Sequence, residues 1–447
     1  MNNRTTTHSG TRRTPPEPPS PPIIGHTYEF FRRDPLDWFT ELNETYGPVV
    51  QLRVAGQRLI LPTEPDDIER VLLTNSENYE KGGFQKMVTR SLLGDGLVIA
   101  EGEKWRAKRQ GIEPVFHPKR MEEYQSVITS HTQSTIDRIS SGETVNIEQE
   151  MKHLTLNIIV DALFGVDLST EDWDLEPAFK RILAHFERIS QTYLYLPEWI
   201  PTPENRAYRS AISTLDSAVE DLIAAHRVGD VDGPTVLNYL LESDEDWDTK
   251  DLRDEIVTLL LAGHETTALM LTFTGDLLAR HPEVQETVAR EVREKPLSYF
   301  FGYNDEYSEP DKVIQESLRL YPPVYGIFRQ PIEDDQLSGF HIPSGSIIAL
   351  NQWVVHRDSR WYQSPTQFNP QRWSKQFEKS LPAGAFFPFA AGPRRCVGER
   401  FARLEAKLIL IDVLREFRIT RSTDESLDVV PSLTTQPAES VSVTFRD

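Results

Sequence analysis

The chain has 447 residues, and its 69 Asp and Glu against 48 Lys and Arg give a formal net charge of −21. Hydrophobic residues make up 38% and charged residues 26%, proportions that fit a folded globular protein and exclude a mostly disordered one. So acidic a chain lacks the basic surface that nucleic-acid binding requires, and we expect no nucleic-acid partner.

Arginine far outnumbers lysine in this acidic chain. A large negative charge with few lysines is typical of surfaces solvated in high salt, so we predict a halophilic protein; an ordinary acidic cytosolic enzyme is the alternative. The single cysteine, Cys396, excludes an internal disulfide and a multi-cysteine zinc site. The polar N-terminus does not resemble a signal peptide, and no continuous apolar stretch reaches about 18 residues. We therefore expect a cytoplasmic location and no membrane anchor.

The predicted elements alternate between helical and strand-like patterns. We expect residues 1–22 to be a disordered polar and Pro-rich tail, followed by a helix over 34–46 and a hairpin over 49–62. Most of 63–290 is predicted helical, strand-like runs return at 324–350, and an amphipathic helix follows over 398–414. These patterns predict a mainly α fold with minor β (α+β), in which residues 23–447 form a single large helix-rich domain with small β-sheets.

Cys396 lies in the loop FFPFAAGPRRCVGERFA at 386–402, directly before the last predicted helix. A helix N-terminus favours an anion, and two arginines precede the cysteine, so we expect a lowered thiol pKa. Such a thiolate is a candidate nucleophile or metal ligand. The alternative is a buried cysteine that acts only as a small apolar residue; the flanking glycines and arginines disfavour it.

A long helix is predicted over about 249–280, with Asp248 or Thr249 as its cap. Its middle is AGHETT at 262–267, set between apolar runs. A Glu and two Thr there need partners if buried, and Thr can bond a carbonyl one turn back and distort the helix. A zinc-protease motif is excluded, because H-E-x-x-H requires His where Ala268 stands.

Several polar pairs stand at helical spacing elsewhere. Glu316 and Arg319 lie three residues apart, ahead of the segment FNPQRW at 368–373, and Trp105 and Arg109 lie four apart. Separate surface ion pairs are the alternative interpretation of each.

These motifs together resemble the cytochrome P450 family. The pattern F-x-x-G-x-R-x-C-x-G, filled by Phe389, Gly392, Arg394, Cys396 and Gly398, is similar to the family's haem-thiolate loop. AGHETT resembles its oxygen-activation motif, and the remaining segments resemble its E-x-x-R helix, F-x-P-x-R segment and W-x-x-x-R helix, in the expected order over roughly 20–445. Gln371 replaces a Glu often found in the second segment. The resemblance implies the cytochrome P450 fold.

The resemblance also implies a set of site residues. Cys396 would be the axial metal ligand, to the iron of haem b. Thr266 would stabilise the activated oxygen by a hydrogen bond, Glu265 would help to relay protons, and Ala262 and Gly263 would leave room over the haem. Glu316, Arg319 and Arg372 would form a buried charge network. The remaining cofactor-binding candidates are Phe389 beside the sulfur, the loop residues Gly392 and Gly398, and the propionate partners Arg394, Trp105, Arg109 and Arg329.

The implied activity is that of a haem-thiolate monooxygenase, which inserts one oxygen atom from O2 into a lipophilic substrate, fatty acid or isoprenoid-like. Apolar segments at 80–100, 180–200 and 324–328 are expected to line its pocket. Electrons would come from a separate donor of ferredoxin type, docked on the basic residues Lys104, Arg106, Lys108, Arg395, Arg400 and Arg403. Two alternatives are a peroxide-using haem-thiolate enzyme (peroxygenase or isomerase) and a non-enzymatic haem-dependent gas sensor.

Overall fold

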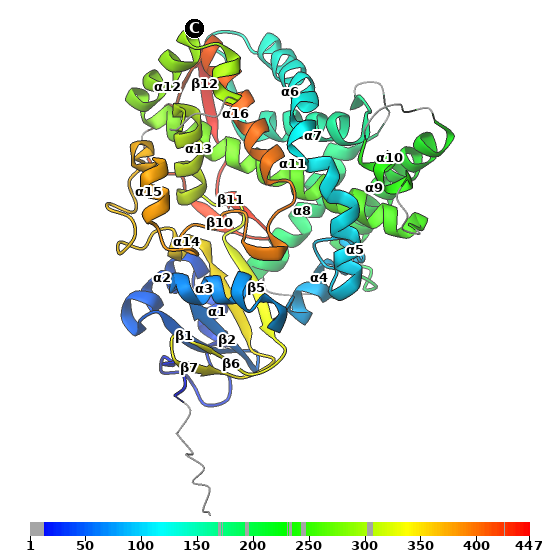
Figure 1. Ribbon diagram of the computed structural model, residues 1–447. Helices are drawn as coiled ribbons and strands as arrows, with labels where there is room; N and C mark the ends of the chain where they lie inside the picture. The colour runs from blue at the N-terminus through cyan, green and yellow to red at the C-terminus, as the bar shows by residue number, and fades with distance from the viewer. Residues whose placement is uncertain are drawn as a thin grey trace, which may run out of the picture.

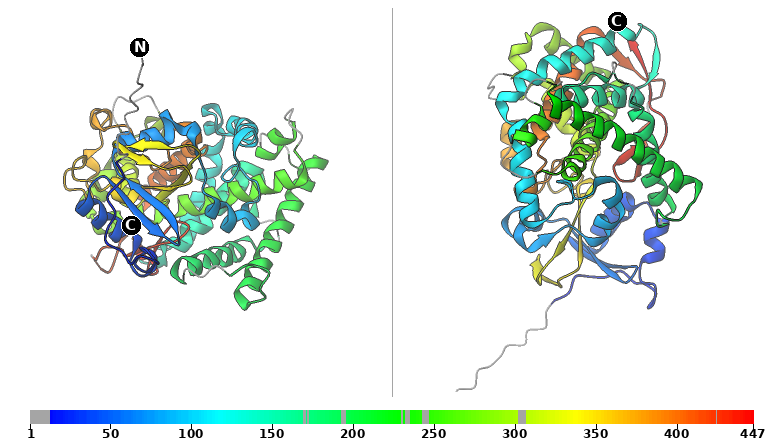
Figure 2. Two further views of the ribbon diagram at one scale, coloured as in Figure 1. Left: turned by 90° about the horizontal axis from the view of Figure 1, so that it is seen from below. Right: turned by 90° about the vertical axis from the view of Figure 1, so that its right-hand side faces the viewer.

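The computed structural model describes residues 13–168, 171, 173–192, 196–229, 231, 235–242, 247–301, 307–423 and 425–447, with the backbone alone at 84–88 and 190–192. Helices form most of this part of the chain, and a smaller region of strands lies at one side (Figures 1 and 2). The predicted fold class, mainly α with small β-sheets, is confirmed.

The bounds of the elements follow the predicted order. The helices are α1 (Thr27–Arg32), α2 (Pro35–Tyr46), α3 (Pro65–Glu69), α4 (Gly83–Leu93), α5 (Gly102–Ile112), α6 (Pro118–Arg138), α7 (Ile147–Phe164), α8 (Leu175–Thr192), α9 (Pro203–Val228), α10 (Val236–Glu242), α11 (Thr249–Arg280), α12 (Pro282–Glu294), α13 (Glu309–Leu320), α14 (Gln352–Val355), α15 (Lys375–Ser380) and α16 (Glu399–Glu416). The strands are β1 (Val49–Val54), β2 (Gln57–Pro62), β3 (Tyr79–Glu80), β4 (Thr144–Asn146), β5 (Gly326–Pro331), β6 (Asp335–Leu337), β7 (Phe340–Ile342), β8 (Ile347–Asn351), β9 (Arg418–Thr420), β10 (Val429–Pro431), β11 (Thr435–Pro437) and β12 (Ser442–Arg446).

The largest sheet has the strand order β1-β2-β8-β5-β3 and so joins the N-terminal strands to the segment 326–351. The predicted hairpin is confirmed: β1 pairs antiparallel with β2, and Val54 faces Gln57 across the turn. β8 lies parallel to β2 and antiparallel to β5. Strands that are nearly 300 residues apart in sequence therefore form one surface, against which Trp38, Phe39 and Leu42 of α2 are buried.

The Pro-rich segment before α1 is extended, as expected, but it lies against this sheet. The backbone carbonyl of Pro16 accepts a hydrogen bond from Gln51 N at 2.9 Å, and that of Arg13 accepts one from His341 N at 2.7 Å. Glu17 also pairs with Arg53 at 3.0 Å. Residues 13–22 are thus packed on the folded body, while the part of the expected tail at 1–12 lies outside the described residues.

Helix α11 runs through the core without interruption. Its start is capped as predicted, because the Asp248 side chain accepts a hydrogen bond from Asp251 N at 2.7 Å. The helix is long and apolar enough to cross a membrane, but 83% of its most apolar window is buried inside the protein. Its composition is therefore that of a core helix.

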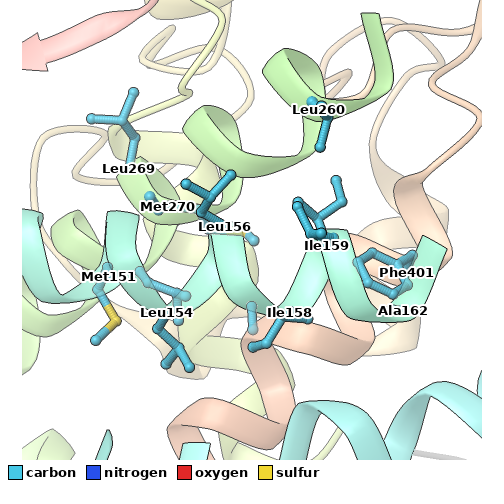
Figure 3. Close-up of a cluster of buried hydrophobic side chains, with 14 of the residues drawn as sticks. Met151, Leu154, Leu156, Ile158, Ile159, Ala162, Leu260, Leu269, Met270 and Phe401 are labelled. Carbon is cyan, nitrogen blue, oxygen red and sulfur yellow. The ribbon is translucent and has the colours of Figure 1, made fainter. Parts of the chain in front are cut away.

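Helix α7 packs along α11, and small residues permit the close approach. A Cβ built on Gly263 would overlap Ile159 Cδ1, and one on Gly275 would overlap Ile147 Cδ1. Figure 3 shows Leu156 and Ile159 of α7 at the interface with α11. The expectation that Gly263 leaves room over the haem is wrong, because the position of a side chain there is filled by Ile159 of α7.

The buried charge network is confirmed. Both carboxylate oxygens of Glu316 accept from Arg319, at 2.8 and 2.9 Å, and Arg372 Nε donates to Glu316 Oε1 at 3.0 Å. Trp373 Nε1 donates to Glu316 Oε2 at 2.8 Å, and Arg319 donates further to the carbonyl of His356 at 2.8 Å. Glu316 and Arg319 are fully buried. The network fixes α13 to His356, which follows α14, and to Arg372 and Trp373 at the short helical turn Pro370–Arg372.

Candidate functional site

The loop before α16 has a shape that depends on its glycine. Cys396 N donates to the carbonyl of Phe389 at 2.9 Å, which closes the loop on itself. Gly392 has φ +70°, and a Cβ there would overlap the backbone carbonyl of Leu72. Only glycine fits such a position without strain. Gly398 is different, since a Cβ there would meet only the ring of Phe116 at 3.7 Å, an ordinary contact.

The thiol of Cys396 combines accessible surface with a raised pKa. Its side chain has accessible surface, yet burial raises the pKa of the thiol. The backbone N–H of Gly398 and the cations Arg109 and Arg395 act in the opposite direction and do not outweigh burial. The expectation of a lowered thiol pKa is therefore wrong for the free side chain. The loss of hydration destabilises the thiolate more than the helix terminus and the nearby arginines stabilise it. A cation bound at the sulfur would favour the thiolate.

The middle of α11 also borders open space. Ala262 is exposed and Thr266 is half-buried, although most of the surrounding helix is buried. Thr266 Oγ1 donates to the carbonyl of Ala262 at 2.6 Å. The helix remains regular there, so the predicted distortion does not occur. Helix α11 packs against α16, the helix that directly follows the cysteine loop.

Glu265 is held on a different side of α11. Its carboxylate is 1% exposed, and Oε1 accepts from Gln436 Nε2 of β11 at 2.7 Å and lies 3.3 Å from Lys152 Nζ of α7. Its other oxygen, Oε2, has no hydrogen-bond partner within the described part of the chain. The carboxylate therefore keeps one free acceptor beside an ion pair.

His264 packs against an aromatic ring. Its ring lies 5.2 Å from that of Phe179, and burial lowers its pKa to about 3, so the imidazole is neutral. Neither ring nitrogen has a hydrogen-bond partner among the described residues.

Two of the predicted propionate partners, Arg394 and Trp105, are in direct contact. The guanidinium of Arg394 lies 4.7 Å from the Trp105 ring centroid and pairs with the Glu101 carboxylate. Arg109 Nη1 donates to the carbonyl of Arg395 at 2.6 Å. The structure thus brings Trp105 and Arg394 together and ties Arg109 to the residue next to Arg394. Arg394 already has a carboxylate partner in Glu101.

Arg329 lacks such a partner. It is 8% exposed, and its hydrogen bond goes to the carbonyl of its neighbour Phe328 at 2.8 Å. Burial lowers its pKa to about 10, and the nearby charge of Arg394 acts in the same direction. Within the described ranges no carboxylate forms an ion pair with it. A buried cation without an anion is costly, so this position is suited to an anionic group from outside the chain.

The residues present fit a haem group. The described residues contain no cluster of three or more metal-ligating side chains, so a metal bound at Cys396 must bring its other ligands with it, as a porphyrin does. Arg329 offers an uncompensated charge for a carboxylate. Ala262 and Cys396 both have accessible surface, so neither position is closed to a bound group by packing.

Three contacts of the site were not predicted: Glu101 with Arg394, and Lys152 and Gln436 with Glu265. Each joins segments more than a hundred residues apart, and no local spacing marks such pairs.

The expected basic cluster is corrected at one position. Lys108 is buried and pairs with Glu255 at 2.8 Å, so it is not available to a docking partner. Lys104, Arg106, Arg395 and Arg400 are exposed, although Arg106 pairs with Glu103 and Arg395 with Glu399.

The expected pocket segments are only partly described. Leu92, Leu93 and Phe186 are buried, and Trp199 is 77% exposed, so it faces solvent. Tyr193 and Tyr195 lie outside the described residues, as do the side chains of Phe84 and Met87.

Comparison with known proteins gives a consistent result over nearly the whole chain. A family model described as Cytochrome P450 matches residues 15–443. Cyclooctat-9-en-7-ol 5-monooxygenase of Streptomyces melanosporofaciens is 32% identical over 414 residues, which cover 90% of this chain and 88% of that protein. Pentalenene oxygenase of Streptomyces avermitilis is 30% identical over 418 residues, 91% of each chain.

Solved structures agree with these matches. The cytochrome P450DA heme domain superposes with a TM-score of 0.86 at 26% identity and covers 98% of both chains. The retinoic acid bound cyanobacterial CYP120A1 superposes with a TM-score of 0.84 at 25% identity, over 98% of this chain and 100% of that one. The chain therefore belongs to the cytochrome P450 family and is an oxidoreductase of the monooxygenase type.

Proposed function

We propose that the protein binds haem b through Cys396 and inserts one oxygen atom from O2 into a lipophilic, isoprenoid-like substrate. The observation that carries the proposal is the Cys396 thiol, which has accessible surface although burial raises its pKa, in a part of the chain without a competing metal-ligand cluster. Haem held there would supply the iron centre at which O2 is activated and transferred.

The protein's own residues would position the cofactor and manage protons. Arg329 would pair with a propionate and so compensate its buried charge, with Arg394, Arg109 and Trp105 beside it. The glycine at 392 would hold the cysteine loop in its closed shape.

Proton handling would fall to the middle of α11. Thr266 now donates to Ala262 O, and a rotation about its Cα–Cβ bond would aim the same hydroxyl at the open space. Glu265, held through Oε1 by Lys152 and Gln436, would pass protons through its other oxygen, Oε2, which has no hydrogen-bond partner among the described residues.

The relatives support an isoprenoid-like substrate over a fatty acid. The printed names of two of them refer to cyclooctat-9-en-7-ol and pentalenene. Leu92 and Phe186, from the segments expected to line the pocket, are buried apolar side chains and are compatible with such a hydrocarbon body.

For electron supply we propose a separate, acidic donor of ferredoxin type, docked near the exposed cations Lys104, Arg395 and Arg400. Reversing Lys104 and Arg400 to Glu should slow reduction by such a donor and weaken its dependence on salt. An unchanged reduction rate would remove this docking surface.

We further propose that the protein functions in a cytoplasm of high salt, where dissolved ions screen the mutual repulsion of its net charge of −21. The corresponding test is unfolding at rising KCl: the unfolding midpoint should keep increasing at molar salt, and a midpoint that falls would contradict the proposal.

The function itself is tested with the Cys396→Ser variant. The reduced carbon monoxide spectrum of the wild-type holoprotein should show thiolate ligation, and the variant should lose that signature while it retains its fold by circular dichroism. Product formed with O2 and a reductant, and not with peroxide alone, distinguishes the monooxygenase from a peroxide-using enzyme. Tight gas binding without product would indicate a sensor.

A further inference from the structure

A concave site is lined by none of the residues of the cysteine loop. It has a volume of about 770 Å³, within the usual range for small-molecule sites. Its lining residues come from the start of α2, the C-terminal ends of α11 and α13, α14 and Arg357 shortly after it, residues 366–368, and residues 426–429 at the start of β10. None of the residues assigned above to haem binding or oxygen chemistry lines this cleft.

One wall of the cleft carries a cation without a counterion. The Arg357 guanidinium stacks 3.3 Å from the Trp353 ring centroid and donates to the backbone carbonyls of Leu320 and, at 3.4 Å, Trp353. Among the described residues it forms no ion pair with a carboxylate. Burial lowers the pKa of Arg357 to about 9, because the charged guanidinium loses its hydration there. Arg280, in the same cleft, pairs with Asp276 at 2.7 Å and is satisfied.

The rest of the wall is largely aromatic and aliphatic. Tyr321, Trp353 and Phe368 line the cleft together with Leu277 and Val429. The Tyr321 ring is fixed by stacking on Phe273, with centroids 4.9 Å apart. An apolar body can pack on such a surface while one end reaches the guanidinium.

Acidic side chains restrict the charge of an occupant. Asp34, Asp37 and Asp428 also line the cleft, and they disfavour a ligand with more than one negative charge. Asp34 is occupied as the cap of α2, where its carboxylate accepts from Leu36 N at 2.7 Å.

We propose that this cleft binds an apolar monocarboxylate, with the carboxylate on Arg357 and the hydrocarbon body against Tyr321, Trp353 and Phe368. A carboxylate matches the two parallel N–H groups of a guanidinium and restores the missing counterion. The site does not depend on the proposed oxygenase activity.

Photocrosslinking of the holoprotein tests the site. A diazirine-bearing dodecanoic acid should label peptides that contain Trp353 or Phe368, and the matching diazirine dodecanol should label them roughly tenfold less. Peptide mapping separates this site from labelling at residues 262–266 of the haem region. Equal labelling by acid and alcohol, or labelling confined to 262–266, would overturn the proposal.

Variants make the test specific. Arg357→Gln should lower labelling by the acid roughly tenfold, whereas the matched control Arg280→Gln, a change to a paired arginine in the same cleft, should leave it unchanged. Arg357 also donates to the backbone carbonyls of Leu320 and Trp353, so its replacement also alters the local structure. A second variant, Val429→Trp, leaves Arg357 in place and fills the cleft from its partly exposed edge. Labelling that persists in Val429→Trp contradicts the proposed site.

Discussion

Lys152 of α7 and Glu265 of α11 face each other with Nζ and Oε1 3.3 Å apart, and the same oxygen accepts a hydrogen bond from Gln436 of β11. Three segments that are distant in sequence thus meet at one carboxylate. The contact joins α7, α11 and the C-terminal hairpin beside the helix turn that carries Thr266.

The first prediction concerns the loss of this cation. Lys152→Met leaves the buried Glu265 carboxylate with Gln436 as its remaining partner, so we expect the free energy of unfolding to fall by about 1–3 kcal/mol. Urea unfolding followed by circular dichroism measures the change. The control Lys180→Met removes an exposed lysine of α8 and should have an effect below about 0.5 kcal/mol. Equal losses in the two variants would show that the ion pair is not stabilising.

The second prediction concerns the network around Glu316. Arg319→Leu leaves a fully buried carboxylate with weaker compensation, and we expect a loss of about 3–5 kcal/mol in the free energy of unfolding. Trp373→Phe removes only the 2.8 Å hydrogen bond to Glu316 Oε2 and should cost about 1–2 kcal/mol. Arg290→Leu, at an exposed position of α12, is the control. A loss for Arg319→Leu as small as that of the control would contradict the assigned role.

The third prediction concerns the cysteine loop. Gly392→Ala forces a Cβ into the backbone of Leu72 at φ +70°, so the loop must move and haem retention should fall. Gly339→Ala has the same kind of backbone, with φ +76°, and nothing within 4 Å of the new Cβ. It should cost only the conformational strain, about 1–2 kcal/mol. Haem content after gel filtration and the thermal unfolding midpoint compare the two; identical behaviour would mean that steric overlap has no part in the loop's shape.

The fourth prediction concerns pH. Burial lowers the pKa of His264 to about 3, whereas an unfolded histidine titrates near 6.5. Below about pH 6.5 the unfolded chain takes up a proton that the folded protein refuses, so stability falls by about 1.4 kcal/mol per pH unit from there towards pH 3. His264→Leu removes this contribution, and its loss of stability between pH 7 and pH 5 should be about 2 kcal/mol smaller than that of the wild type.

Urea unfolding at the two pH values measures this difference. The control is His153→Leu, which changes an exposed histidine of α7 and should keep the wild-type pH dependence. If His264→Leu and the wild type lose the same stability on acidification, the buried imidazole is not the cause of acid sensitivity.

Local features of the fold were predictable because they depend on neighbouring residues. The apolar run and the Asp248 cap define α11, Ala55 and Gly56 define the hairpin turn, and the glycines around Cys396 mark its loop. The network of Glu316, Arg319 and Arg372 could be predicted only from the family motifs. The spacing of the residues alone does not indicate that Arg372 meets Glu316 in the folded protein.

The features that sequence analysis missed all depend on the surroundings of a side chain. The thiol pKa is a balance between the helix terminus, which local sequence reveals, and desolvation, which it does not. Lys108 has the same appearance as the exposed Lys104 until α11 supplies Glu255. Gly263 was assigned to the wrong side of α11, because a motif does not state which helix will pack on it.

The glycine contacts between α7 and α11 have a consequence for how this protein can diversify. At Gly263 and Gly275 even a methyl group would overlap α7, so that interface tolerates neither larger side chains nor a shift of one helix past the other. The face of α11 that packs on α7 is fixed by these two glycines. We therefore expect substitutions that alter the binding of a substrate, or that admit substrates of a different shape, to occur on the opposite side of α11, away from α7.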